Sequence, residues 1–239
     1  MKIPGSNARF ISPGLASILA AIMLATGSAL AAEQQAPPQV TPEGLNLVAS
    51  TETRLVYAAD DADLAQYSKV MIVECAVAFE KNWQRDYNRS FADAGIRVRD
   101  EDVARMKKRL ATEFKKVFTE TMVAHGFDVV TAAASDVLIL RPALINVVAN
   151  APDVMSSSKS RTYVTSAGHM TLYLELYDSV SSSLLAKVYD VAQDDRATLS
   201  IAGTNKAMNL AAVDRILASW AGELAAHFAE VAGPAPEKP

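Results

Sequence analysis

The apolar run between Lys69 and Phe79 constrains the fold more than any other segment. Its Val, Ile, Met, Cys and Ala side chains occupy both sets of alternating positions, so a strand built from it is apolar on both faces. The β-branched content favours a strand over the alternative, a buried helix. Because both faces of such a strand must be covered, the run predicts the centre of a sheet packed between other elements.

Two segments have the periodicity of amphipathic helices. The first opens with an acidic turn at Asp100 and stops at His125-Gly126, where glycine can adopt the left-handed conformation that ends helices. The second begins near Thr204 or Asn205. Their apolar stripes, spaced by three and four, are Val103, Met106, Leu110, Phe114, Val117 and Phe118 in the first and Leu210, Val213, Leu217, Trp220, Leu224 and Phe228 in the second.

The remaining patterns are those of strands. Phe127–Val130 and Val137–Val148 are predicted strands, and Pro142 marks a bulge, an edge or a strand start. Strict alternation from Met170 to Tyr177 predicts a half-exposed strand, which a turn joins to a second strand at 184–191. This order predicts an α/β (α+β) fold: a single mixed sheet of about four to six strands packed with two main amphipathic helices, ending in a β-hairpin and a C-terminal helix.

The N-terminal end has the pattern of a secretory signal peptide. Lys2 and Arg9 precede an apolar stretch at 15–25, which is too short to span a bilayer, and Ala29-Leu30-Ala31 supplies a cleavage pattern. No Cys follows the cleavage site, so we expect an exported periplasmic protein that is not a lipoprotein and has no transmembrane segment after processing. The expected parts are a signal peptide at 1–31, a flexible leader at 32–41, one α/β domain at 42–232 and a disordered tail at 233–239.

Charge and cysteine content exclude some functions. Cleavage leaves 21 basic against 27 acidic groups, a net charge of −6 that disfavours nucleic-acid binding. Cys75 is the one cysteine, so no intramolecular disulfide forms and stability must come from packing. The basic cluster from Lys107 to Lys116 is interpreted as a solvated helix face, with peripheral contact to anionic lipid heads or glycan phosphates as the alternative.

The search for reactive groups predicts no catalytic residue, no metal site and no cofactor. The three His residues are scattered, and neither a Gly-x-Ser-x-Gly elbow nor a glycine-rich phosphate loop is present. Three alternatives stay open: Cys75 as a nucleophile activated by His169 or His227, an Asp194-Asp195 hydrolase centre, and calcium binding by Asp60-Asp61-Ala62-Asp63.

The segment from Lys81 to Phe91 joins aromatic and basic residues, a composition enriched at protein interfaces. It is the candidate partner contact. The alternative is that its aromatic residues pin a long connection onto the core. The candidate contact residues are Trp83, Arg85, Tyr87, Arg89 and Phe91.

From Pro42-Glu43-Gly44-Leu45 to its end, the chain resembles the uncharacterised envelope family called domain of unknown function 3313. The shared motifs are Tyr67-Ser68-Lys69-Val70-Met71, Gly126-Phe127 with Asp136-Val137-Leu138, Glu175-Leu176-Tyr177-Asp178-Ser179 and Trp220-Ala221. The resemblance implies a framework rather than an activity. Many family members look like lipoproteins, whereas this sequence lacks the lipidated Cys. The element order is also similar to the small α/β domains of TolB, CsgG and LpoB, which act in envelope assembly through protein contacts.

We therefore expect a non-enzymatic periplasmic accessory or assembly protein of the envelope that binds a protein partner noncovalently. The alternatives are a periplasmic carrier of a small apolar ligand or lipid, and an unrecognised hydrolase.

Overall fold

The computed structural model describes residues 36–94, 97–149, 168–193 and 206–232. The predicted signal peptide, the predicted tail and Asp194-Asp195 lie outside these residues. The elements are β1 (Asn46–Ser50), β2 (Arg54–Ala58), β3 (Lys69–Ile72), β4 (Ala76–Phe79), α1 (Trp83–Ser90), the short 3₁₀ helix η1 (Ala92–Ala94), α2 (Asp100–Ala124), β5 (Asp128–Val129), β6 (Val137–Ala149), β7 (Gly168–Asp178), β8 (Leu184–Gln193) and α3 (Lys206–Ala232).

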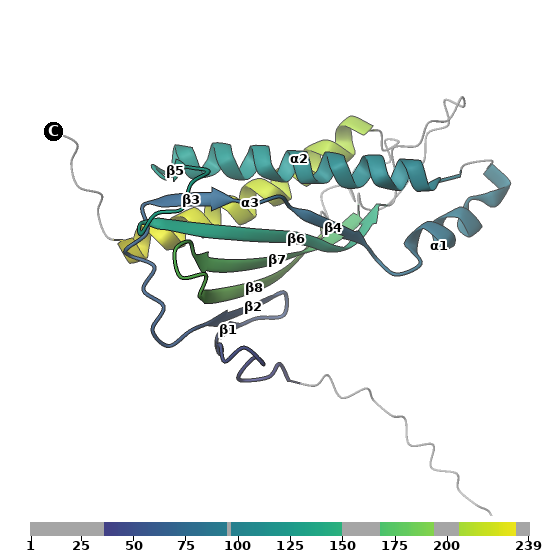
Figure 1. Ribbon diagram of the computed structural model, residues 1–239. Helices are drawn as coiled ribbons and strands as arrows, with labels where there is room; N and C mark the ends of the chain where they lie inside the picture. The colour runs from purple at the N-terminus through teal and green to yellow at the C-terminus, as the bar shows by residue number, and fades with distance from the viewer. Residues whose placement is uncertain (1–35, 95–96, 150–167, 194–205, 233–239) are drawn as a thin grey trace, which may run out of the picture. The chain divides into compact units, whose positions relative to one another are not determined.

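The eight strands within the described residues form one mixed sheet in the order β1-β2-β8-β7-β6-β3-β5, with β4 also paired to β6 (Figure 1). Strand β6 is parallel to β3 and β4 on one side and antiparallel to β7 on the other. The predicted mixed α/β fold is confirmed, although the strand number exceeds the expected four to six. Part of the excess is the β1–β2 hairpin, which the sequence analysis did not predict and which extends the sheet beyond β8.

The apolar run from Lys69 to Phe79 forms two strands instead of the single one predicted. Residues 73–75 separate β3 from β4, and both strands pair with β6. The Val73 N–H donates to the carbonyl of Leu140 at 3.1 Å, so the backbone groups of Leu140 point toward β3. Every second residue of a strand directs its backbone groups to the same side. Pro142, two residues further on, therefore faces the interruption, where its missing N–H removes no ladder bond. This stretch of β6 is locally an edge, one of the three settings predicted for Pro142.

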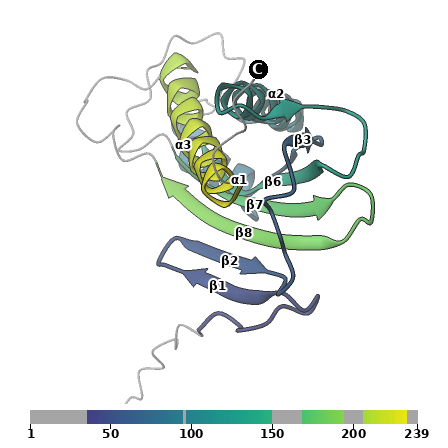
Figure 2. The ribbon, with the colours of Figure 1, turned by 90° about the vertical axis from the view of Figure 1, so that its left-hand side faces the viewer.

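Helices α2 and α3 lie side by side over one face of the sheet (Figure 2). Helix α2 ends as predicted, with Gly126 at φ 89° directly after the His125 cap. The predicted stripe of α2, and that of α3 from Val213 onward, enter the core, and Trp220 is buried there. No helix in the described part of the chain is long and apolar enough to cross a membrane. The principal core residues are Phe114, Phe118 and Met122 of α2, Leu217 and Phe228 of α3, and Leu172, Leu174 and Leu176 of β7.

Three of the family-like motifs meet at one end of the sheet. The Tyr67 hydroxyl donates to the Asp178 carboxylate at 2.9 Å, and Lys69 Nζ lies 2.8 Å from Asp136 Oδ2. The Ser179 hydroxyl donates at 2.7 Å to a backbone carbonyl just before β6. These bonds tie β3, β6 and the β7–β8 turn together, which explains the framework role that the resemblance implied.

Gly168 is required where β7 begins. Its φ is 138°, and a Cβ placed there would lie 1.9 Å from the Val148 carbonyl oxygen, an atom of the neighbouring strand. We expect Gly168→Ala to lower the free energy of unfolding by about 1–3 kcal/mol, because either the strand pairing or the backbone must distort.

The matched control is Gly222→Ala in α3, where a Cβ meets nothing within 4 Å. Alanine favours a helix over glycine by about 1 kcal/mol, so this variant should be as stable as the wild type or more stable. Urea unfolding followed by circular dichroism measures both. Equal destabilisation by the two substitutions would contradict the steric argument.

Asp178 gives a pH-dependent contribution to stability. Hydrogen bonds from the Ser181 amide and hydroxyl and from Tyr67 lower the pKa of its carboxyl to about 2. A carboxyl whose pKa is depressed by folding stabilises the protein above its unfolded-state pKa and loses that effect as pH falls. We therefore expect Asp178→Asn to lower the melting temperature at pH 7, and the difference from wild type to shrink between about pH 4 and pH 2. Asp61→Asn, at an exposed site, is the control; a difference independent of pH would refute the charge argument.

Candidate functional site

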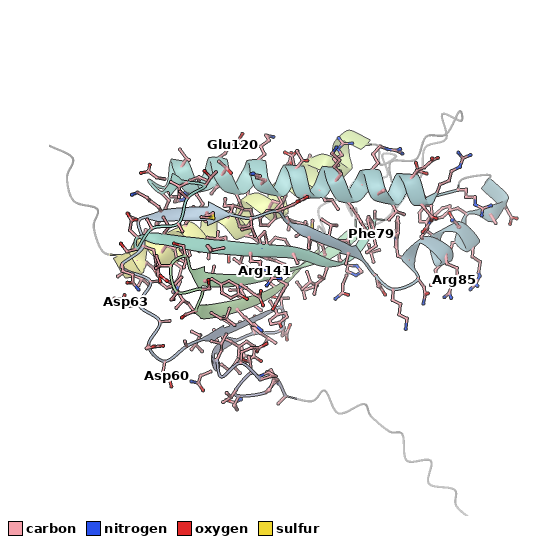
Figure 3. The ribbon with its side chains drawn as sticks, viewed as in Figure 1. Asp60, Asp63, Phe79, Arg85, Glu120 and Arg141 are labelled. Carbon is pink, nitrogen blue, oxygen red and sulfur yellow. The ribbon has the colours of Figure 1, made fainter. Side chains whose placement is uncertain are left out.

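Within the described residues, the helices leave one face of the sheet uncovered, and this face carries the candidate site (Figure 2). Leu172, Leu174 and Leu176 of β7 pack in the helix-covered core, so the alternate residues of the strand point the other way. Figure 3 marks Arg141 on β6 within this region. We call the helix-free face the set Tyr57 of β2, Arg141 of β6, Tyr173, Glu175 and Tyr177 of β7, and Lys187 and Tyr189 of β8.

Strand register aligns four of these residues in a row across the sheet. Arg141 is opposite Glu175, Glu175 is opposite Lys187, and Lys187 is opposite Tyr57. Opposite charges on directly facing strand positions attract, so this alternation of charge favours the register. The row joins β6, β7, β8 and β2, which are distant in the sequence.

Glu175 lies at the centre of the row and is only 7% exposed. Its carboxylate accepts hydrogen bonds from Arg141 Nη1 at 3.2 Å, from the Tyr177 hydroxyl at 3.0 Å and from the Tyr173 hydroxyl. A buried carboxylate is costly unless it is paired and hydrogen-bonded. The three donors satisfy Glu175 and, in turn, hold the two tyrosines and the arginine in place.

Lys187 is the second buried charge, with 6% of its surface exposed. Its ammonium lies 2.7 Å from Glu43 Oε1 and 3.7 Å from Glu175 Oε1. Burial favours the neutral amine, but the hydrogen bond to Glu43 and the charges of both carboxylates outweigh burial and raise the pKa of Lys187. The lysine therefore carries its charge at neutral pH.

The tyrosine rings pack against one another on the helix-free face. Tyr173 and Tyr189 have ring centroids 4.9 Å apart, and Tyr57 meets Tyr189 edge-on at 6.5 Å. Burial and the bond to Glu175 raise the pKa of Tyr173 well above its usual value, so its hydroxyl remains a donor at neutral pH. The face is thus a fixed array of rings, donors and paired charges, which suits binding better than proton transfer.

The predicted contact segment forms helix α1 and lies apart from the helix-free face, as Arg85 and Arg141 show in Figure 3. Trp83 and Tyr87 are buried, and the Trp83 indole donates to a backbone carbonyl at the end of β6 at 3.2 Å. The aromatic residues thus pack as the alternative interpretation expected: Phe79 on Trp83, Trp83 on Tyr87 and Tyr87 on Phe91.

Of the five candidate contact residues, the two arginines remain exposed. The side chains of Arg85 and Arg89 are 60% and 74% exposed, and both lie within ion-pair distance of Asp86. Partner contact through this surface stays a prediction, carried by the arginines and not by the buried aromatic rings.

The structure argues against Cys75 as a nucleophile. The residue is 4% exposed, and burial raises the pKa of its thiol to about 12, so the thiolate needed for attack is scarce at neutral pH. The imidazole of His169 instead lies 3.7 Å from Glu80.

The aspartates at 60–63 act in a turn. Asp60 accepts from the Asn46 side chain at 2.7 Å, and Asp63 accepts from the Ala65 amide at 2.9 Å. Within the described ranges, no three acidic, His or Cys side chains are placed to hold a metal ion.

The helix-free face was not predicted from the sequence. The alternation at 170–177 predicted a half-exposed β7, yet Thr171 and Glu175 on its outward side are buried, so that prediction was wrong. The available signal was the Tyr-x-Glu-x-Tyr alternation at 173–177. Arg141 is 34 residues away from Glu175 in the chain, and only the strand register brings them together.

Comparisons with solved structures return distant similarities of fold. A PelC dodecamer from Paraburkholderia phytofirmans is 12% identical, with 72% of this chain and 96% of that chain covered and a TM-score of 0.36. A DUF4136 family protein from Bacteroides thetaiotaomicron is 13% identical, with coverages of 76% and 98% and a TM-score of 0.31. A putative neuraminyllactose-binding hemagglutinin homolog from Helicobacter pylori is 12% identical, with coverages of 69% and 83% and a TM-score of 0.26. Similarities of this size do not bear on function.

A comparison with curated proteins finds no match to the chain.

The comparison with protein families gives a match over most of the chain. The family model described as "Protein of unknown function (DUF3313)" matches residues 43–224, which include every strand and most of α3. The resemblance found in the sequence motifs is thereby confirmed, and the chain belongs to the DUF3313 family.

Proposed function

We propose that this protein is an exported, non-enzymatic accessory protein of the cell envelope and that it binds a protein partner through the helix-free face. The observation that carries the proposal is the buried Glu175 with its three donors, because it holds aromatic and cationic side chains in one arrangement before any partner arrives. Binding to such a surface costs little side-chain entropy.

The composition of the face supports a protein partner. Tyrosine and arginine are enriched at the centres of protein interfaces, since each combines a large contact area with hydrogen-bonding groups. The Arg141 side chain is 64% exposed although it is anchored to Glu175, so it can meet a partner without rearrangement.

Two alternatives are less well supported. A carrier of an apolar ligand needs space between the sheet and the helices, where Phe114 and Phe118 stack with ring centroids 3.9 Å apart and are fully buried. A Cys75 hydrolase needs a thiolate, which the raised thiol pKa disfavours.

Export is tested directly. The chain expressed in a Gram-negative host should appear in the osmotic-shock fraction. Its first residue should be Ala32 or Glu33, because signal peptidase is expected to cut after Ala31 or Ala32. Intact-mass measurement identifies the terminus. Recovery of the unprocessed chain from the cytosol alone would contradict the proposal.

Site-specific cross-linking in cells tests the surface. p-Benzoylphenylalanine at Val191, which is 45% exposed and lies on the same face of β8 as Lys187 and Tyr189, should give a discrete protein adduct. The same probe at Val123, 56% exposed on α2, should not. Arg141→Ala should reduce the Val191 adduct severalfold while the protein stays folded, because it removes an exposed anchor.

A third probe position separates the two candidate surfaces. An adduct at Arg85, with none at Val191, would move the partner contact to α1 and the segment predicted from the sequence. Arg85→Ala serves as the matched charge-removing variant and should leave the Val191 adduct unchanged.

A further inference from the structure

The charges on the helix-free face balance only when an acid from outside the sheet joins them. Arg141 and Lys187 are both cationic, and Glu175 lies between them as the single acid of the row. Glu175 is already engaged by Arg141 and two tyrosine hydroxyls. Its oxygen is 3.7 Å from Lys187 Nζ, longer than the 2.7 Å between Lys187 and Glu43. The closer counter-ion of Lys187 is therefore the carboxylate of Glu43.

Glu43 comes from a short turn ahead of the first strand. Two backbone hydrogen bonds close the turn: the Thr41 N–H donates to the Leu45 carbonyl at 2.8 Å, and the Gly44 N–H donates to the Thr41 carbonyl at 2.9 Å. It is attached to β1 by a hydrogen bond that the Leu47 N–H donates to the Gln39 carbonyl at 2.8 Å. We call residues 39–45 the N-terminal turn. None of these backbone bonds involves β2, β8 or β7, so displacing the turn would not break the pairing of those strands.

Two residues of the N-terminal turn define what it contributes to the face. The Glu43 carboxylate meets the buried ammonium of Lys187, and Leu45, two positions later, is 2% exposed. Glu43 itself is half-exposed, and the hydrogen bond from Lys187 lowers its pKa. Removing the turn would take away the nearest anion of Lys187 and leave only the more distant Glu175, so the vacated place favours another carboxylate.

We propose that Lys187 is a carboxylate-binding site, that Glu43 of the N-terminal turn occupies it in the free protein, and that the partner displaces this turn with a segment of its own. The segment carries an acidic residue followed two positions later by an apolar one, the pattern of Glu43 and Leu45. The inference rests on the proposed function and adds to it the chemistry of the partner and a built-in competitor for the site.

A peptide copied from the turn provides the probe. Fluorescein-labelled Pro-Gln-Val-Thr-Pro-Glu-Gly-Leu-Asn-Leu, the sequence of residues 38–47, is titrated with the full-length mature protein at low salt and followed by anisotropy. Glu43→Gln should bind this peptide at least about tenfold more tightly than wild type, because the competing carboxylate is gone. A peptide with Gln in place of Glu should lose that gain.

Variants of the protein complete the test. Glu43→Gln combined with Lys187→Met should lose the gain as well, and Glu52→Gln, at an exposed position of the β1–β2 turn, should behave as wild type. If the Lys187 variant does not fold, the Gln peptide still tests the need for a carboxylate. Equal affinity of wild type and Glu43→Gln, or equal binding of the Glu and Gln peptides, would overturn the proposal.

Hydrogen exchange separates this inference from the proposed function. In Glu43→Gln, the amides of Leu45 and Leu47, which are bonded within the turn and to it, should exchange faster than in wild type. If the peptide binds and exchange is faster but no adduct forms at Val191, the carboxylate site at Lys187 stands and the proposed partner contact fails. If an adduct forms at Val191 but Glu43→Gln changes neither peptide binding nor exchange, the partner contact stands and the carboxylate site fails.

Discussion

Strand β6 is the constraint on which the rest of the structure depends. Its 13 residues pair along one side with β3 and β4 in parallel and along the other with β7 in an antiparallel register. Parallel partners require a crossover, which α2 supplies between β4 and β5, whereas the antiparallel partner continues directly into the β7–β8 hairpin. The mixed character of the sheet follows from this dual pairing, and the crossover through α2 places that helix over one of its faces.

The same pairing gives the two faces their different chemistry. Side chains alternate along a strand, so the leucines of β7 that enter the helix-covered core set the intervening tyrosines and Glu175 on the opposite side. The helix-covered face also holds an ion pair. Asp190 of β8 is buried beside Trp220 of α3, and Arg54 of β2 pairs with the Asp190 carboxylate. Burial raises the pKa of Asp190 in spite of that arginine. The hairpin β1–β2 is thus held to the sheet by this ion pair as well as by the pairing of β2 with β8.

The parts of the fold that local periodicity determines were predictable. Helix α2 and its stop at Gly126, the stripe of α3 and the β7–β8 hairpin each depend on residues a few positions apart. The division of the Lys69–Phe79 run depends on Pro142, some 70 residues downstream, and was missed. Strands β1 and β2 lack a clear alternation, and their place depends on pairing with β8. The candidate site was missed for the same reason, because Tyr57, Arg141, Glu175 and Lys187 become neighbours only through register. Composition alone pointed instead to the segment containing Trp83 and Tyr87, whose rings turn inward.

Cys75 has a consequence for the chemistry of the protein in an oxidising environment. A neutral thiol shielded by the core reacts slowly with disulfides and peroxides, since both reactions require the thiolate and access to it. A native molecule therefore forms mixed disulfides with its neighbours only slowly, whereas an unfolded one exposes its single thiol at once. The residue distinguishes folded from unfolded chains and offers a single reporter position for thiol-directed labels.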